Sequence, residues 1–289
     1  MRRNRFRAVS GILTFAGMLM LSACGSAPGS AGNALAGANE AQSSVDQPYT
    51  ANPNARAMEE EQALLADPGC AAATGQAGMV LDDVVARFNG LVADGAPWPV
   101  PVGHPDAPEN GVAVRVCAGS KVAAYSYDSL VVLHEGLLSL LNDAATAKVL
   151  YGSGAAYDGA LLKIAMDAEA GIYNSPIDST QNETMTGEAG ALFASALAFV
   201  TYHELGHSQL ARQQTPLGEY APLEDEETRA DLFAAEALRE TGYSQEGANL
   251  VFEILGLMSP GGSLNHASAQ ERLVTLKQST SDAEVFAVE

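Results

Sequence analysis

The sequence is poor in basic residues, tryptophan and cysteine. It has 15 lysines and arginines against 35 aspartates and glutamates, one tryptophan and three cysteines, and its formal net charge is −20. An acidic chain repels nucleic acid and anionic lipid head groups, so we expect neither as a partner. Polypeptides remain open as partners. After the first 24 residues, no run approaches the roughly 18 apolar residues that a membrane-spanning helix needs.

The first 24 residues are typical of a bacterial lipoprotein signal. Four arginines precede a short apolar stretch, and Leu21-Ser22-Ala23-Cys24 resembles a lipobox. The resemblance implies cleavage of residues 1–23 and lipid on Cys24, which would be the only membrane contact. The alternative is an ordinary cleaved signal with a chance cysteine. Loss of the four arginines would change the charge from −20 to −24. Because Gly25 stands where a retaining aspartate would be, we expect the periplasmic face of the outer membrane.

Two further segments follow the signal. Residues 24–57 are rich in small and polar residues and predict a disordered tether. Residues 58–289 are long enough for one domain with a sizeable core. Within it, Cys70 and Cys117 lie outside any CxxC pattern, and we expect a disulfide between them in an extracytoplasmic compartment. Two separately buried thiols are the alternative.

The domain is predicted to be α+β, mostly helical, with a small sheet near its beginning. Alternating apolar residues at 112–116 predict one strand, and 122–132 predicts one or two more. A polar loop is expected over 171–187. The expected helices cover 81–92, 136–150, 158–169, 188–211, 224–240 and 245–258, and the last begins near Ser268, which has capping-box spacing to Glu271.

The longest of these helices carries an HExxH motif, His203-Glu204-Leu205-Gly206-His207. Residues four apart lie on the same side of a helix, so both imidazoles can bind one Zn²⁺. Glu204 lies close enough to take a proton from water that the metal activates. HExxH also arises by chance, so the assignment needs a third ligand.

Acidic residues at the start of the next helix supply candidates for that ligand, because a catalytic zinc takes three protein ligands. Gln213 stands where the metzincin pattern would have its third histidine. Glu227 and Asp231 share the inward face, whereas Glu224 and Glu226 are expected to face solvent. We expect Glu227 as the third ligand and Asp231 as the carboxylate that orients a ligand imidazole. The alternative is an acidic helix start with no metal role.

HExxH followed by Glu227-x-x-Ala-Asp231 resembles the gluzincins of the CaaX prenyl protease and HtpX heat-shock protease family. His266 and Arg272 keep the separation of that family's H-P-x-x-x-x-R motif, with alanine in place of the proline. Residues 127–141 (YDSLVVLHEGLLSLL) are similar to the family's edge strand and following helix. The resemblance implies a zincin-like fold whose sheet borders the HExxH helix. It also implies that His266 stabilises an oxyanion and that Arg272 organises the site.

These features together predict a zinc-dependent endopeptidase that acts on envelope or misfolded polypeptides, with Glu204 as general base. A strand around 130–133 is expected to be an edge strand that binds extended peptide by strand addition. One alternative is a non-hydrolytic zinc lipoprotein that acts as a scaffold or chaperone, and the intact Glu204 speaks against it. Another is a lipoprotein in which HExxH is incidental, with His266 a surface loop residue. His104 and His134 match no motif and are expected to be ordinary loop or strand residues.

Overall fold

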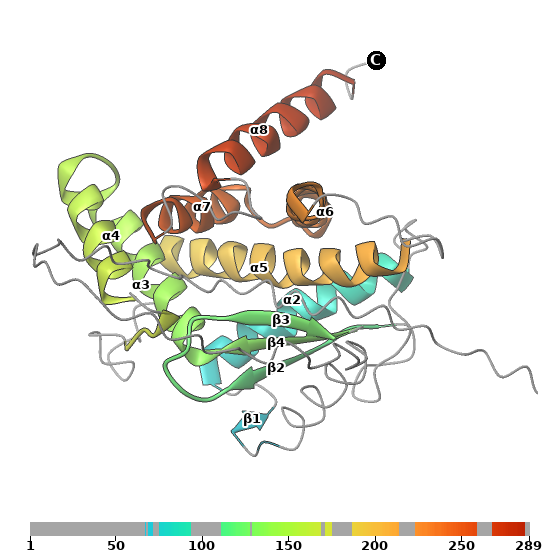
Figure 1. The fold of residues 1–289 in the computed structure, drawn as a ribbon, viewed down its shortest axis with the longest axis horizontal. Helices are drawn as coiled ribbons and strands as arrows, with labels where there is room; N and C mark the ends of the chain where they lie inside the picture. The colour runs from blue at the N-terminus through green and yellow to red at the C-terminus, as the bar shows by residue number, and fades with distance from the viewer. Residues whose placement is uncertain are drawn as a thin grey trace, which may run out of the picture.

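The computed structural model is mostly helical with a small mixed sheet, which confirms the α+β class. Helix α5 (Glu188–Gln213) crosses above the sheet, α6 (Leu223–Thr241) and α7 (Glu246–Met258) lie on its other side, and α8 (Ala269–Phe286) projects outward (Figure 1). The structure describes residues 67, 69–71, 75–93, 111–127, 129–168, 171–174, 187–213, 223–258 and 268–286.

The sheet corrects one prediction. Its order is β1 (Cys70–Ala71), β2 (Ala113–Cys117), β4 (Leu130–His134) and β3 (Ala124–Tyr127). Strands β2 and β4 are parallel, whereas β3 pairs antiparallel with β4. The expected edge strand at 130–133 is therefore an inner strand, and the described sheet ends at β3 on that side. The apolar run of β4 is fully buried on both faces, which is typical of a central strand.

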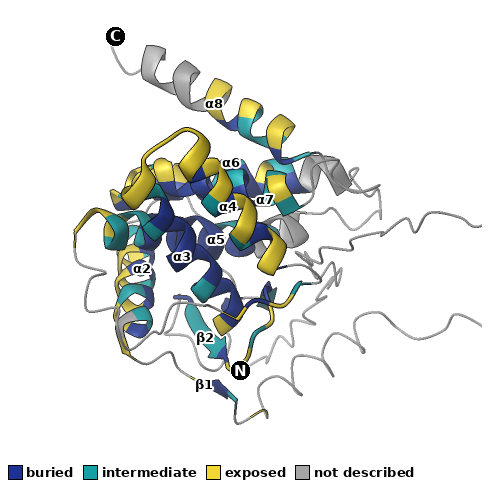
Figure 2. Cartoon of the chain, turned by 90° about the vertical axis from the view of Figure 1, so that its left-hand side faces the viewer, coloured by how far each residue is buried: buried dark blue, intermediate teal, exposed yellow. Residues whose placement is uncertain are grey.

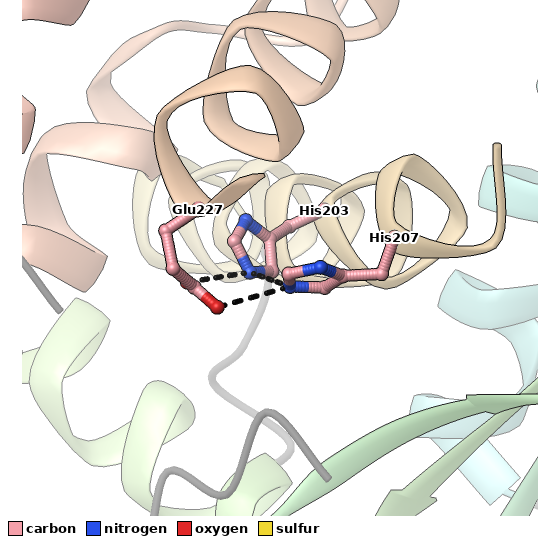
Figure 3. A group of neighbouring side chains, drawn as sticks. All are labelled: His203, His207 and Glu227. Atoms are coloured by element: carbon pink, nitrogen blue, oxygen red, sulfur yellow. Dashed lines mark hydrogen bonds and ion pairs between the residues drawn. The ribbon is translucent and has the colours of Figure 1, made fainter. Parts of the chain in front are cut away.

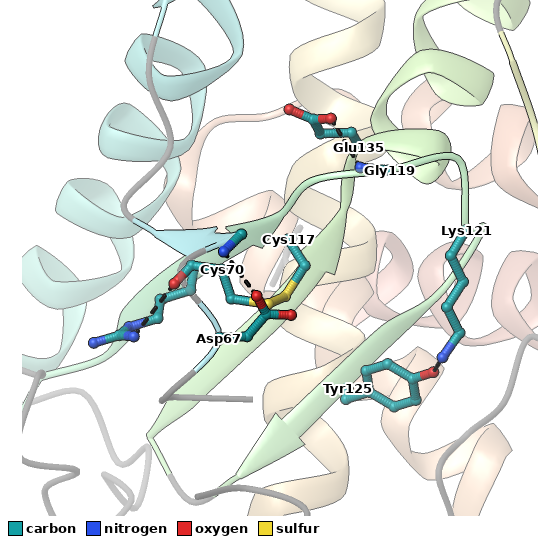
Figure 4. The surroundings of a disulfide bond; sticks show 9 residues. Asp67, Cys70, Cys117, Gly119, Lys121, Tyr125 and Glu135 are labelled. Carbon is teal, nitrogen blue, oxygen red and sulfur yellow. Dashed lines mark hydrogen bonds between the residues drawn. A yellow bond between two sulfur atoms is a disulfide. The ribbon is translucent and has the colours of Figure 1, made fainter. Parts of the chain in front are cut away.

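A disulfide fastens the short strand β1 to the sheet. Cys70 and Cys117 face each other directly in the antiparallel pair of β1 and β2 and are bonded through their sulfurs (Figure 4). Both are buried, and Leu130 and Val132 pack beside them. Sequence reasoning missed β1, because two residues carry no periodic pattern.

The main core lies between the other face of the sheet and the helices. Ala124, Val131 and Leu133 point into it from β3 and β4, and α5 is buried along most of its described length (Figure 2). Helix α7 crosses α5 with backbones in contact. A Cβ built on Gly247 would lie 2.2 Å from the carbonyl carbon of Ser195, so only glycine permits this crossing.

The remaining helices match their predicted positions within a few residues, except that α2 starts earlier than expected. They are α2 (Gly75–Ala93), α3 (Glu135–Tyr151) and α4 (Ala155–Asp167). At the start of α8, the Ser268 N–H donates to Glu271 at 2.9 Å, and the Glu271 N–H donates to the Ser268 hydroxyl at 3.3 Å, as in a capping box. Within the ranges that the structure describes, no helix has the length and apolarity to cross a membrane. Residues 1–57, with Cys24, and His104 lie outside those ranges.

Candidate metal centre

The HExxH histidines lie side by side on α5 and face α6 (Figure 3). The Nε2 atoms of His203 and His207 are 3.0 Å apart. Two neutral imidazoles can satisfy such a contact only if one donates a proton that the other accepts. A cation placed between them would satisfy both lone pairs at once.

Glu227 closes this pair from the neighbouring helix. Its Oε2 lies 3.5 Å from Nε2 of His203, and its Oε1 lies 3.3 Å from Nε2 of His207. One ligand atom from each of the three residues lies within 4.8 Å of the other two. The structure therefore brings together the three residues expected as metal ligands from two separate helices.

Close packing of α6 on α5 makes this approach possible. A Cβ built on Gly206 would lie 2.9 Å from the Cα of Ala230, a distance that real side chains essentially never show. Glycine within the HExxH motif and alanine between Glu227 and Asp231 thus let the two backbones approach. Glu227 lies one turn before Ala230, so the same contact places its carboxylate against the histidines.

Asp231 and Arg272 lie behind the three candidate ligands. Asp231 Oδ1 is 2.9 Å from Nδ1 of His203, which favours the tautomer with its proton on Nδ1 and leaves Nε2 free to bind a metal. Arg272, from α8, donates from Nε and Nη2 to the two oxygens of Asp231, each at 2.7 Å. Its Nη2 also lies 3.2 Å from Oε2 of Glu227. This chain of contacts fixes the carboxylates and the ring of His203 together.

Burial and neighbouring charges shift the pKa values of the three acidic residues Glu204, Glu227 and Asp231. Burial raises the pKa of Glu227, but hydrogen bonds from His203 and His207 outweigh it and hold that pKa well below its usual range. Burial also opposes ionisation of Asp231, yet the Arg272 guanidinium brings its pKa below the ordinary value. For Glu204, burial dominates and raises the pKa. A carboxyl with a raised pKa is suited to accept and return protons near neutral pH.

The donor set fits a divalent metal. Two imidazole nitrogens and one ionised carboxylate oxygen are the ligand types of catalytic zinc sites, which keep a fourth position open. Two ionised acids, Glu227 and Asp231, lie within ion-pair distance of the Arg272 guanidinium, so the described cluster can take further positive charge. Among the described residues, no other group of histidine, cysteine or acidic side chains converges in this way.

One family model matches the part of the chain that carries these residues. Residues 165–285 match the family model described as Peptidase U49. The match indicates a peptidase family. It spans α5, α6 and α7 and nearly all of α8, so it includes every residue of the cluster. No curated protein and no solved structure matches the chain.

Two aromatic residues complete the surroundings, and sequence reasoning missed them. The ring of Phe199 lies 6.3 Å from that of His203 and 5.5 Å from that of Phe252, and the Arg272 guanidinium lies 5.4 Å from the Phe252 ring. Phe199 precedes His203 by one helical turn, a spacing that the sequence displays. Phe252 comes from α7 and gave no such signal. The expected oxyanion residue, His266, lies outside the described residues, as do the side chains of Glu224 and Glu226.

Proposed function

We propose that this chain is a zinc-dependent peptidase in which His203, His207 and Glu227 hold the metal and Glu204 is the general base. The observation that carries the proposal is the convergence of these three ligand atoms within 4.8 Å of one another. The Asp231 carboxylate at Nδ1 of His203 adds support, because metal-binding histidines commonly donate their other ring proton to a carboxylate. The peptidase family match covers all of these residues.

Each side chain then has a defined task. Zinc bound here would activate a water molecule for attack and polarise the scissile carbonyl. Glu204 accepts the proton of the attacking water and delivers it to the leaving amine nitrogen. Asp231 and Arg272 keep His203 and Glu227 in a fixed orientation. His266 donates a hydrogen bond to the developing oxyanion, as the resemblance to the CaaX prenyl protease and HtpX family implies.

The proposal extends to substrate and location. We propose polypeptides of the cell envelope, misfolded ones included, as substrates, bound in extended form along the edge of β3 that pairs with no described strand. That strand packs against α5 in the same core, so a peptide added to it would lie near the HExxH helix (Figure 1). The signal sequence supports a lipid-anchored protein, tethered by residues 24–57 and placed at the periplasmic face of the outer membrane.

Metal content and one substitution test the function. Purified protein is expected to hold about one Zn²⁺ per chain and to cleave unfolded casein, with the products mapped by mass spectrometry. Glu204→Gln should keep the metal and lose activity by about 10²–10⁴-fold. Glu236→Gln, the same change on the exposed face of α6, is the matched control and should be fully active. Zinc without Glu204-dependent cleavage would instead favour a zinc-containing scaffold. Absence of zinc would contradict both the zinc peptidase and the scaffold.

A further inference from the structure

On the edge of β3 that faces away from β4, a limited set of backbone groups pairs with no described strand. In an antiparallel pair, alternate residues bond to the partner strand and those between them point away from it. The N–H of His134 donates to the carbonyl of Ala123 at 3.1 Å, so the backbone groups of Ala123 point toward β4. Tyr125 and Tyr127 follow Ala123 at intervals of two residues, and their backbone groups therefore point toward β4 as well. The backbone groups of Ala124 and Ser126 therefore point outward, toward any added strand.

The same edge is occupied just before β3. The Val122 N–H donates to the carbonyl of Gly171 at 2.7 Å, and the Tyr173 N–H donates to the carbonyl of Ser120 at 2.6 Å. These bonds flank the antiparallel bridge between Lys121 and Ile172. Ser120 and Val122 belong to the same outward alternation as Ala124 and Ser126. Residues 171–173 thus already occupy the position that an added strand would reach next.

This segment is anchored on both sides. The side chain of Tyr173 is buried, and its hydroxyl donates to Oδ2 of Asp143 on α3 at 2.5 Å. Gly171 donates its N–H to the carbonyl of Ala168, the residue that follows α4, at 3.2 Å. A buried hydroxyl bonded to a buried carboxylate resists displacement, because separation would leave both groups without a partner. Gly171–Tyr173 is therefore held in place on both sides, and we call it the stop because an added strand could not extend past it.

The direction of the ladder decides which end of a substrate meets this stop. A peptide that pairs antiparallel with β3 runs in the same direction as residues 171–173, so its C-terminal end points toward Gly171. Antiparallel pairing is also slightly more stable per residue than parallel pairing. We propose that Gly171–Tyr173 bounds the substrate-binding edge, so that the protein releases only short fragments from the C-terminal ends of polypeptides.

This inference rests on the proposed peptidase function and narrows the expected endopeptidase to an enzyme that trims C-terminal ends. Strand β3 has four residues, and each residue of an added strand faces one of them. Cleavage at a bond within the stretch that pairs with β3 would therefore release a C-terminal fragment of no more than about four residues. The N-terminal side of the substrate is not bounded by this segment.

Wild-type protein tests the inference with two fusions. An unfolded polypeptide is fused to a folded domain at its N-terminus in one substrate and at its C-terminus in the other. The N-terminal fusion should lose short C-terminal fragments in mass spectra, and the C-terminal fusion should be cleaved at least about tenfold more slowly. Equal cleavage of both, at internal bonds and dependent on Glu204, would overturn the inference and leave the peptidase function standing. No Glu204-dependent cleavage of either would overturn both.

Two variants examine the stop itself. Tyr173→Ala removes the anchor to Asp143, so the released fragments should become longer and the C-terminal fusion should be cleaved faster. Ile172→Ala is the matched control, since that side chain is half exposed and the flanking backbone bonds do not depend on it. Circular dichroism checks that both variants fold. If Tyr173→Ala does not fold, the comparison of the two wild-type fusions decides the matter alone.

Discussion

Two of the polar clusters among the described helices differ in how their charges are matched. The metal cluster consists of His203, His207, Glu227, Asp231 and Arg272 on α5, α6 and α8. The second, which we call the tyrosine cluster, consists of Lys148, Tyr157 and Glu253 on α3, α4 and α7.

The tyrosine cluster pairs each of its groups. Lys148 Nζ lies 3.1 and 3.2 Å from the two carboxylate oxygens of Glu253, and the Tyr157 hydroxyl donates to one of the same oxygens. The Lys148 ammonium also lies 4.4 Å from the centre of the Tyr157 ring. One cation, one anion and one hydroxyl are matched, so this cluster needs nothing from outside the chain.

In the metal cluster, by contrast, hydrogen bonds from the imidazoles to Glu227 require protons on Nε2, the nitrogen that would bind a metal. Neutral imidazoles with their protons on Nδ1 would present two Nε2 lone pairs to the oxygens of the ionised Glu227, and the Arg272 guanidinium lies mainly on Asp231, behind them. A protein tolerates such crowding when a bound cation offsets it. The tyrosine cluster therefore joins helices through matched charges, whereas the metal cluster has the arrangement of groups that a bound cation would match. Four experiments test this difference.

Metal removal should have the largest effect, and only through the metal cluster. A chelator is expected to abolish cleavage and to lower the melting temperature, since zinc at 1,000 times its Kd stabilises the folded state by about 4 kcal/mol. Added Zn²⁺ should restore both. Glu253→Gln, in the tyrosine cluster, is the control and should show the same chelator response as wild type. A melting temperature that does not change when the chelator is added would contradict the assignment of the cluster as a metal site.

The substitution Asp231→Asn should have the second-largest effect. The amide keeps the shape of the side chain but removes the charge that faces Nδ1 of His203 and the guanidinium of Arg272. Loss of a carboxylate behind a ligand histidine typically weakens metal binding by about 10–100-fold. Competition with a fluorescent zinc chelator measures this. Asp167→Asn, on the exposed pair with Lys163, serves as the control and should leave the affinity unchanged. Unchanged affinity in Asp231→Asn would mean that this carboxylate orients nothing.

The sequence was most informative where chemistry depends on local spacing. HExxH on one helix and Glu227 with Asp231 on the next are visible as i, i+4 patterns, and the structure brings these residues together. Long-range order was not visible. The position of β4 inside the sheet depends on which strands pair, and Phe252 reaches the site only because α7 crosses α5. Ile172, which forms a bridge with Lys121, falls in the segment 171–187 expected to be a polar loop. The sequence could not show this pairing, because it depends on backbone atoms alone.

Gly206→Ala should have an intermediate effect. The added methyl would meet Ala230 and push α6 away from α5, together with Glu227. Overpacking of this kind costs about 1–3 kcal/mol, so the free energy of unfolding should fall by that amount and zinc affinity should fall as well. Gly159→Ala is the matched control, since no atom lies within 4 Å of its added Cβ on α4. That variant should gain up to about 1 kcal/mol from helix propensity. An equally stable Gly206→Ala protein with full zinc affinity would contradict the role of the close approach.

Tyr157→Phe should have the smallest effect, and it examines the tyrosine cluster. The change removes one hydrogen bond to Glu253 but keeps the ring beneath the Lys148 ammonium. We expect the free energy of unfolding to fall by about 1 kcal/mol, the usual net contribution of one hydrogen bond, because Lys148 still partners Glu253. Urea unfolding measures the loss. Zinc affinity and cleavage should equal those of wild type, because the charges of the tyrosine cluster are matched without a metal. A drop in zinc affinity would show that the two clusters are coupled through α7, which contributes Glu253 to one and Phe252 to the surroundings of the other.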